Sequence, residues 1–470
     1  MIIKLNRKFV CITLICLCIL FTVLLAFYPG LVSYDGNSQW QQVQSRIITD
    51  AHPFFSTFFM LLLSKIWNSI TVVVVYQILL VSITWAYLCK IIKLENKKQT
   101  ILMYIFTIIV MLLPLTCLFS ITVWKDIIYT SYLFLCAILL FEWSENKYAF
   151  SARKCCLLGL MIAMVFSYRH NGIIVSLLLL VIIYFITIRK YIKKEMQKIN
   201  FRKCFCILGT FIIIITIISV PKKIILEDSR KKLNNASRNE VSYSTIDSYM
   251  LWMMGAHIKE KNINDKADKN FLNNIIPLKE WKKAYNPYLI NNTGLTPNLN
   301  KEFLVKNSSK FEKLFLKYSF SNPLTIFIHY LKADSLLIDP FASFHGYVYV
   351  YCFPEMWMLP DYTVIRPKFK LVNNIYNKIV GYSLRKPFIM FYQPAFILYL
   401  SLIITFILAK RVYGKRIWMF SLPMILNIIS LLPINLAQDL RYVYINYWTF
   451  YGLLLLFIIN YKKIFKRKRA

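Results

Sequence analysis

Long apolar runs separated by short polar connectors make up most of the chain. A helix needs about 20 mainly apolar residues to cross about 30 Å of hydrocarbon, so runs of this kind indicate an integral membrane protein. The pattern predicts about ten spans, near residues 9–28, 70–92, 100–118, 127–143, 155–168, 172–188, 205–221, 388–409, 417–434 and 445–461. The apolar stretch 54–67 is too short to cross alone, and we expect it to lie in the interface or to re-enter.

The composition agrees with this class of protein. Of the 470 residues, 58% are hydrophobic and 16% are aromatic, and the mean hydropathy is +0.52. A soluble domain is about 45–50% apolar, so the composition excludes a soluble globular protein. The first run, Phe9 to Phe27, is long for a signal-peptide core, and no small-residue cleavage site follows it. We therefore expect it to be retained.

The placement of basic residues predicts the orientation. The formal net charge is +35, and most of it falls in segments on one predicted side of the membrane: 1–8, 93–99, 145–154, 189–203, 410–416 and 462–470. The opposite connectors hold few cations, namely Arg46, Lys125, Arg169 and Arg441. The positive-inside rule thus predicts a multi-pass protein of the cell membrane with both termini in the cytoplasm. Nucleic-acid binding is the other explanation of so basic a chain, but anionic lipid explains cations at span ends.

A long polar insertion, residues 222–387, separates the seventh and eighth predicted spans. It is too long for a simple linker, and its own apolar residues predict a packed extracytoplasmic domain of mixed α/β or mainly α structure. The stretch 322–340 is amphipathic and contains His329, Lys332 and Asp334, which argues against a further span. The expected organisation is a membrane core with catalytic outer loops over 1–221, this domain, and C-terminal transmembrane helices over 388–470.

Two kinds of site lack a signature in the sequence. The eleven cysteines fall mostly in predicted spans or cytoplasmic segments, so they imply no disulfide framework, and no cysteine–histidine spacing suits zinc. The chain has only 11 glycines and no glycine-rich phosphate loop, so cytosolic ATP-driven chemistry has no visible site.

Ionisable residues gather in four connectors on the predicted outer face. Ionisable groups at membrane depth are costly and mark a functional site by default. Asp35 and Asp126 could deprotonate a hydroxyl or hold a divalent cation. Phosphate oxygens could be bound by the basic residues of the same connectors, which are His52, Lys125, Arg169, His170 and Arg441. The first of these connectors also contains Asp50, and the last contains Asp439.

This combination suits one reaction at the membrane surface. A sugar would pass from a lipid-anchored, phosphate-linked donor to a hydroxyl, and the cations would stabilise the leaving lipid phosphate. Asp35 or Asp126 would be the base or would hold Mg²⁺ or Mn²⁺, with the metal ligands left open. The expected partners are the lipid-linked donor, membrane lipids and an envelope acceptor, which is a wall polymer, a glycolipid or a protein. Nucleic acid is not among them.

Each candidate also has a simpler structural explanation. Asp35 could cap a helix that starts at Gly36, and Lys125 with Asp126 could form an interfacial pair that caps the next span. Arg169 and Arg441 could contact lipid phosphates, and His52 with Pro53 could form only a turn. All four connectors are nevertheless polar and poor in cations, which favours a shared site.

The arrangement resembles the GT-C superfamily of membrane glycosyltransferases, in which a long first span precedes an outer loop with an essential acid. The segments YPGLVSYDGNSQWQQ, HPFFSTFF, TVWKDIIYT, YRHNG and DLRYVY are similar to a poorly characterised multi-pass family of Gram-positive bacteria. The likeness covers the membrane core and not residues 222–387. It implies an all-α polytopic, GT-C-like fold, a polyprenyl-phosphate sugar as donor, and Asp35 and Asp126 as the first-loop and second-loop acids. Many members carry paired acids where Asp35 stands alone, so the metal stays open.

Two other classes of function are compatible with many spans. A transporter or flippase of lipid-linked saccharides also needs buried charges, but such proteins tend to show inverted repeats and breaks within spans. The chain shows no internal repeat, and its charges lie at the outer ends of the predicted spans. A non-catalytic scaffold that binds partners through the outer domain would leave the polar connectors unexplained.

Overall fold

The computed structural model is almost entirely helical and describes residues 6–236, 245–294, 296–346, 360–385 and 388–465. The chain divides into two compact units. Unit 1 comprises Met1–Leu233, Tyr349–Ser430 and Arg441–Ala470, and unit 2 comprises Asn234–Val348 and Leu431–Leu440. The boundary at residue 222 expected from the sequence falls inside a continuous helix, and the structure divides the chain at residue 234 instead.

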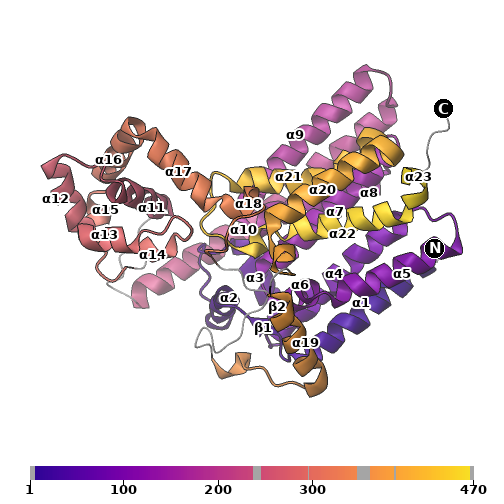
Figure 1. Cartoon of the computed structure of the whole chain (residues 1–470), viewed down its shortest axis with the longest axis horizontal. Coiled ribbons are helices and arrows are strands. Elements are labelled where there is room, and N and C mark those ends of the chain that lie inside the picture. The colour runs from indigo at the N-terminus through magenta and orange to yellow at the C-terminus, as the bar shows by residue number, and fades with distance from the viewer. Residues whose placement is uncertain (1–5, 237–244, 295, 347–359, 386–387, 466–470) are drawn as a thin grey trace. The chain divides into compact units, whose positions relative to one another are not determined.

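Unit 1 contains the apolar helices, which Figure 1 shows with their labels. In chain order its elements are α1 (Arg7–Ala26), β1 (Leu31–Val32), α2 (Tyr34–Ser45), α3 (Phe54–Ser64), α4 (Thr71–Ile91), α5 (Lys97–Leu112), α6 (Pro114–Ser120), β2 (Thr122–Val123), α7 (Lys125–Glu145), α8 (Ala152–Tyr168), α9 (His170–Ile192) and α10 (Lys198–Ala236). They continue with α19 (Lys370–Ser383), α20 (Pro394–Leu408), α21 (Trp418–Leu431), α22 (Ile445–Ile459) and α23 (Tyr461–Phe465).

Among the described residues, six helices are long and apolar enough to cross a membrane, and a bent pair would make a seventh. The six are α1, α4, α7, α9, most of α10 and the segment Pro394–Leu431, while the bent pair, α5 and α6, meets at 65°. The predicted count of about ten is not confirmed. Two predicted spans, 388–409 and 417–434, share the segment Pro394–Leu431, and α8 and α22 have only 17 and 15 residues. Apolar runs locate helices but do not show whether neighbouring ones are continuous.

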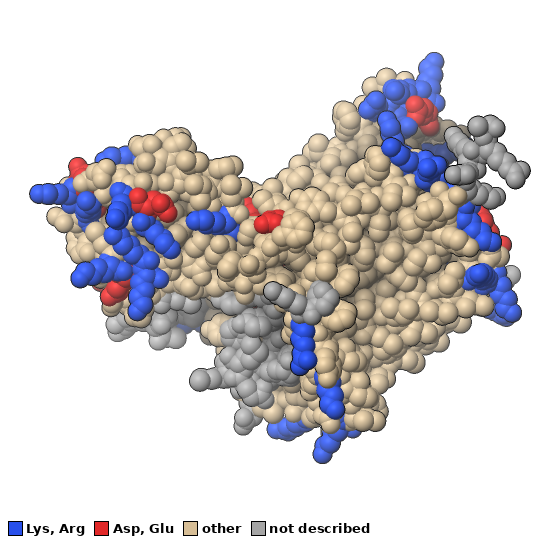
Figure 2. Space-filling model, in the orientation of Figure 1, with Lys and Arg blue, Asp and Glu red and all other residues tan. Residues whose placement is uncertain are grey.

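The apolar helices differ in how much surface they expose. α7 contacts α4, α8 and α22 and is buried along nearly its whole length. In contrast, α9 and α10 expose large apolar side chains such as Val181, Phe185 and Ile213. Surfaces of this kind suit contact with lipid. On the face shown in Figure 2, the surface over α20 and α22 has few charged residues, whereas Lys and Arg gather where α9 and α23 end.

The cation-rich connectors meet at one end of unit 1. Contacts between them are Lys8 Nζ to Ile92 O (2.9 Å), Gln99 Nε2 to Ile459 O (2.9 Å), Lys463 to Glu95 (2.5 Å) and Arg416 to Glu145 (3.2 Å). Because α7 ends at Glu145, it runs from this end to the opposite one, where it begins at Lys125.

Unit 2 is built from short helices. They are α11 (Thr245–Lys259), α12 (Lys266–Ile275), α13 (Leu278–Ala284), α14 (Asn291–Gly294), α15 (Lys301–Lys306), α16 (Ser308–Ser321), α17 (Pro323–Ala333) and α18 (Ser335–Ile338). Leu251, Leu272, Trp281 and Phe311 are fully buried in its core. The segment 431–440 joins this unit by backbone hydrogen bonds, such as that from Ile290 N to Leu436 O (3.0 Å). Over its described residues, unit 2 matches the mainly α alternative.

Candidate functional site

A short parallel strand pairing brings two of the predicted connectors together. Leu31 of β1 lies opposite Thr122 of β2, and α2 begins directly after β1, as Figure 1 shows. A Cβ atom on Gly36 would come within 2.5 Å of the Val123 carbonyl oxygen. Glycine at this position therefore lets the first turn of α2 pack against β2, and the starts of α2 and α7 become neighbours.

Gln77 of α4 holds β2 from another side. Its Nε2 donates to the carbonyl oxygens of Ser120 (3.3 Å) and Thr122 (2.7 Å), and its Oε1 accepts from the Trp124 amide (3.3 Å). Gln77 is fully buried, and a buried amide must find such partners. We did not single it out from the sequence, although an amide inside an apolar run is the signal that could have found it.

Asp35 lies in the first turn of α2 and does not cap it. Ser33 is the N-cap, and its Oγ accepts a hydrogen bond from the Gly36 amide (3.1 Å). The capping explanation of Asp35 is therefore wrong. The positive end of the helix dipole still favours a carboxylate at this position.

Arg441 and Lys125 hold the Asp35 carboxylate. Arg441 Nη1 donates to Asp35 Oδ2 at 2.7 Å, and Lys125 Nζ lies 3.9 Å from the same oxygen. The Asp35 side chain is still 28% exposed, so another molecule can reach it. Along the sequence, the nearest cation in the connector of Asp35 is Arg46, which is not close to it. The fold corrects this by supplying Arg441 from 406 residues away.

Asp126 is the buried carboxylate of the same group. It is 0% exposed, with Oδ1 2.7 Å from Arg169 Nη1 and Oδ2 3.8 Å from Arg441 Nη1. Neither oxygen makes a hydrogen bond within the described part of the chain. We call Asp35, Lys125, Asp126, Arg169 and Arg441 the charge cluster, in which two acids face three cations. Both arginines therefore contact carboxylates of the chain, and Asp126 is completely buried between them.

Aromatic rings cover the two arginines. The Arg169 guanidinium carbon lies 4.4 Å from the ring centre of Tyr442 and 5.5 Å from that of Tyr129. The Arg441 guanidinium carbon lies 5.5 Å from the ring centre of Trp124. A guanidinium stacked on a ring keeps its planar orientation, which lysine could not reproduce.

Asn427 of α21 forms hydrogen bonds with both tyrosines that cover Arg169. Its Oδ1 accepts from the Tyr129 hydroxyl (2.9 Å) and from Asn171 Nδ2 (3.2 Å), and its Nδ2 donates to the Tyr442 carbonyl oxygen (3.0 Å). We did not predict this residue or Asn171. Asn427 lies within an apolar run, where a polar residue is costly, and this position could have marked it as a candidate site residue.

His52 borders the charge cluster as an uncharged ring. Its Nδ1 lies 3.3 Å from Lys125 Nζ. Burial and the nearby charge of Lys125 lower the pKa of His52 to about 4, so the ring is neutral at pH 7. Because an ammonium group can only donate, Nδ1 is the acceptor and Nε2 carries the hydrogen. Gln39 of α2 holds the first turn of α3, because its Nε2 donates to Ser56 Oγ (2.7 Å) and Thr57 Oγ1 (2.9 Å).

The cations keep Asp35 ionised. Burial raises the pKa of the Asp35 carboxyl, but the charges of Arg441 and Lys125 outweigh burial and hold the pKa well below its usual range. A carboxylate stabilised in this way is a weak base. An anion bound to Arg441 and Lys125 would weaken their field at Asp35 and so raise its basicity.

His170 and Asp50 come from the same connectors but lie outside the charge cluster. His170 is exposed at the start of α9, and its side chain makes no hydrogen bond or ion pair with any residue that the structure describes. Asp50 pairs with Lys222 at 3.0 Å, and both side chains are 43% exposed. The structure thus brings together Asp35, His52, Lys125, Asp126, Arg169 and Arg441, and it leaves His170 apart.

A divalent cation would have to compete with cations of the protein. No group of three or more His, Cys, Asp and Glu side chains is placed to hold a metal within the described ranges. Asp35 and Asp126 are each paired with an arginine, and this donor set does not fit Mg²⁺ or Mn²⁺ without rearrangement. The metal therefore stays a prediction that the reaction proposed below does not use.

Comparison with known proteins leaves the charge cluster as the main evidence on function. No family model matches the chain, and no curated protein or solved structure shows significant similarity to it. What the cluster can do follows from its chemistry. A reachable carboxylate beside a surplus of positive charge can receive a proton while an anionic group is held next to it.

Proposed function

We propose that the chain is a membrane glycosyltransferase that moves a sugar from a polyprenyl-phosphate donor to an extracytoplasmic hydroxyl. The observation that carries the proposal is the sharing of Arg441 between the partly exposed Asp35 and the buried Asp126, with cations outnumbering acids in the charge cluster. The surplus charge suits a lipid phosphate, and the reachable carboxylate suits an acceptor hydroxyl. The resemblance to GT-C enzymes supports the same class of reaction.

In the proposed step, Arg441 and Lys125 bind the donor phosphate. Arg441 has five N–H donors, so it can hold a phosphate oxygen in addition to Asp35. The acceptor oxygen attacks C1 of the sugar, the bond between C1 and the phosphate oxygen breaks, and Asp35 takes the hydroxyl proton. The polyprenyl phosphate leaves as an anion that the two cations stabilise. His52 Nε2–H can donate to the same phosphate.

Asp126 and Arg169 serve this step as positioning residues. Asp126 is fully buried and cannot reach an acceptor, but it contacts both Arg169 and Arg441. It therefore fixes the orientation of Arg441 while Arg441 holds Asp35. Removal of the donor phosphate after the reaction would return Asp35 to its ion pair with Arg441.

We infer that the charge cluster faces the outside of the cell. It lies at the start of α7, and the cation-rich connectors meet where α7 ends. The positive-inside rule assigns cation-rich connectors to the cytoplasm. Both termini would then be cytoplasmic, and the insertion that contains unit 2 would be extracytoplasmic.

This orientation is testable by cysteine labelling. In a cysteine-free background, a single cysteine in place of Lys193 should resist an impermeant maleimide applied to intact cells, whereas one in place of Lys306 should react. Both positions are exposed, so burial does not decide the result. Permeabilised cells provide the control, since both positions should label there. Labelling of position 193 in intact cells would contradict the orientation.

The transfer reaction can be tested with the purified chain in nanodiscs. Polyprenyl-phosphate sugars offered with candidate hydroxyl acceptors should be consumed, and free polyprenyl phosphate should appear in proportion to the glycosylated product. Comparing the lipid-linked sugars and wall polymers of a deletion strain with those of its parent would identify which donor and acceptor to use. A panel in which no donor is consumed beyond the protein-free control would contradict the proposal.

A flippase of lipid-linked saccharides is the second candidate function. The observation that favours it is the fully buried pair of Asp126 and Arg169, because ion pairs within helix bundles also line transport pathways. The two functions give different results in proteoliposomes. A flippase would move the intact donor between leaflets, whereas a transferase would break the bond between sugar and phosphate.

A further inference from the structure

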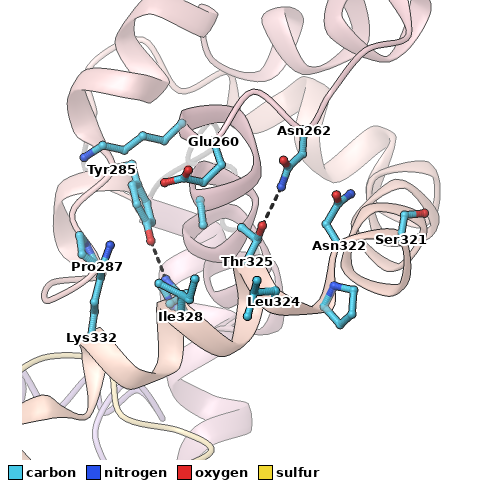
Figure 3. A pocket seen from close by; sticks show the side chains of 14 residues that line it. Glu260, Asn262, Tyr285, Pro287, Ser321, Asn322, Leu324, Thr325, Ile328 and Lys332 are labelled. Atoms are coloured by element: carbon cyan, nitrogen blue, oxygen red, sulfur yellow. Dashed lines mark hydrogen bonds between the residues drawn. The ribbon is translucent and has the colours of Figure 1, made fainter.

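Unit 2 contains a pocket of ≈ 520 Å³. This volume falls within the range of about 300–1,000 Å³ that small-molecule sites occupy. The walls come from the end of α11, the residues after α13, and the junction of α16 with α17. Figure 3 shows Tyr285, Pro287 and Lys332 on one side of the pocket, and Asn262, Asn322 and Thr325 on the other.

Hydrogen bonds fix the polar side chains of the wall. The Tyr285 hydroxyl lies 2.9 Å from His329 Nδ1, and Asn262 Nδ2 donates to both His257 Nδ1 (3.2 Å) and Thr325 Oγ1 (2.7 Å). Burial lowers the pKa of both histidines to about 4, so their rings are uncharged at neutral pH. A ligand would meet a wall that is already ordered, and binding would lose little side-chain entropy.

Several side-chain oxygen atoms of the wall can accept hydrogen bonds from a ligand. Since Asn262 uses its Nδ2, its Oδ1 can accept from a ligand. Asn322 likewise donates Nδ2 to a backbone carbonyl (3.4 Å), and the Ser321 hydroxyl donates to another (2.8 Å). Glu260 adds a carboxylate to the lining. A wall rich in acceptors matches the hydroxyl groups of a sugar, each of which can donate a hydrogen bond.

The charges of the pocket favour a ligand with one negative group. Lys259 and Lys332 line it together with Glu260, which leaves a formal surplus of one positive charge. Lys259 Nζ lies 5.5 Å from the ring centre of Tyr285, so its ammonium group is held at the wall. A polyanion would be repelled by Glu260, and a neutral sugar would form no charge-assisted pair with the lysines.

We propose that this pocket binds a saccharide unit that carries a single acidic group, either a carboxylate or a phosphate monoester. The hydroxyl groups would donate to Asn262, Asn322 and Glu260, and the acidic group would pair with Lys259 and Lys332. The site is separate from the transfer reaction proposed above, because it lies wholly within unit 2 and its binding can be measured without turnover.

Calorimetric titration of the purified full chain can test this site with four probes: glucuronic acid, glucose 6-phosphate, glucose and inorganic phosphate. At least one acidic sugar should bind about tenfold or more tightly than both glucose and inorganic phosphate, because only it offers hydroxyls and a charge together. The stronger of the two acidic sugars identifies the acidic group. Glucose or inorganic phosphate binding as tightly as both acidic sugars would overturn the proposal.

Variants of the two lysines provide the matched control. The Lys259→Gln/Lys332→Gln double variant should lose the preference for the acidic sugar and retain the affinity for glucose, whereas Lys306→Gln should behave like the unmodified chain. All three lysines are exposed, so the substitutions leave the fold intact. Unchanged selectivity in the double variant would overturn the assignment of the acidic group to these lysines.

Discussion

The Asp35→Asn variant is expected to lose sugar transfer by about 10²-fold or more, because a neutral amide cannot take the acceptor proton. The substitution keeps the size of the side chain, and Ser33 still caps α2, so the helix should form normally. Donor binding should be unchanged or tighter, since Arg441 and Lys125 would no longer be partly neutralised by a carboxylate. Turnover and donor affinity of the purified variant, measured separately with a polyprenyl-phosphate sugar, check both expectations.

Asp50→Asn is the matched control for this experiment. Asp50 lies in the same connector, but it forms an exposed pair with Lys222 outside the charge cluster. Its replacement should change transfer little, since exposed ion pairs contribute about 0–1 kcal/mol. Full activity of Asp35→Asn, or an equal loss in both variants, would remove Asp35 from the proposed reaction.

The Asp126→Asn variant is expected to lose about 3–5 kcal/mol in its free energy of unfolding, because Arg169 would remain buried without its counter-charge. Asp126 is 0% exposed and lies 2.7 Å from Arg169, so water cannot replace the lost partner. The double variant Asp126→Asn/Arg169→Gln should regain part of this stability, since two amides leave no uncompensated charge. Denaturant unfolding of the detergent-solubilised chain, followed by fluorescence, would measure both changes.

The exposed pair again supplies the reference, since Asp50→Asn should alter the unfolding free energy by less than about 1 kcal/mol. A double variant that is no more stable than Asp126→Asn would show that Asp126 and Arg169 are not energetically coupled.

Local patterns in the sequence determined the helical class and the positions of most apolar helices. Caps such as Asn96 and Ser151, whose side chains accept from backbone amides, begin helices close to the predicted spans. Helix continuity was less accessible, because Pro394–Leu431 forms one long apolar segment although α20 and α21 lie side by side within it, with Thr405 Oγ1 2.7 Å from Ser421 Oγ, and because α8 has only 17 residues. The assignment of 431–440 to unit 2 depends on its hydrogen bonds to residues near 290, which no local pattern records.

The sequence by itself also singled out the six residues that the structure brings together, since charged residues stand out in an apolar chain. It could not show their pairing, because Asp35 and Arg441 meet only through the packing of helices that lie 406 residues apart. Asp35 and Asp126 are each the second residue of a helix, so their local sequences do not show which carboxylate is buried. Only the tertiary structure buries Asp126 beside Arg169 and leaves Asp35 partly exposed, because burial depends on which helices surround each carboxylate.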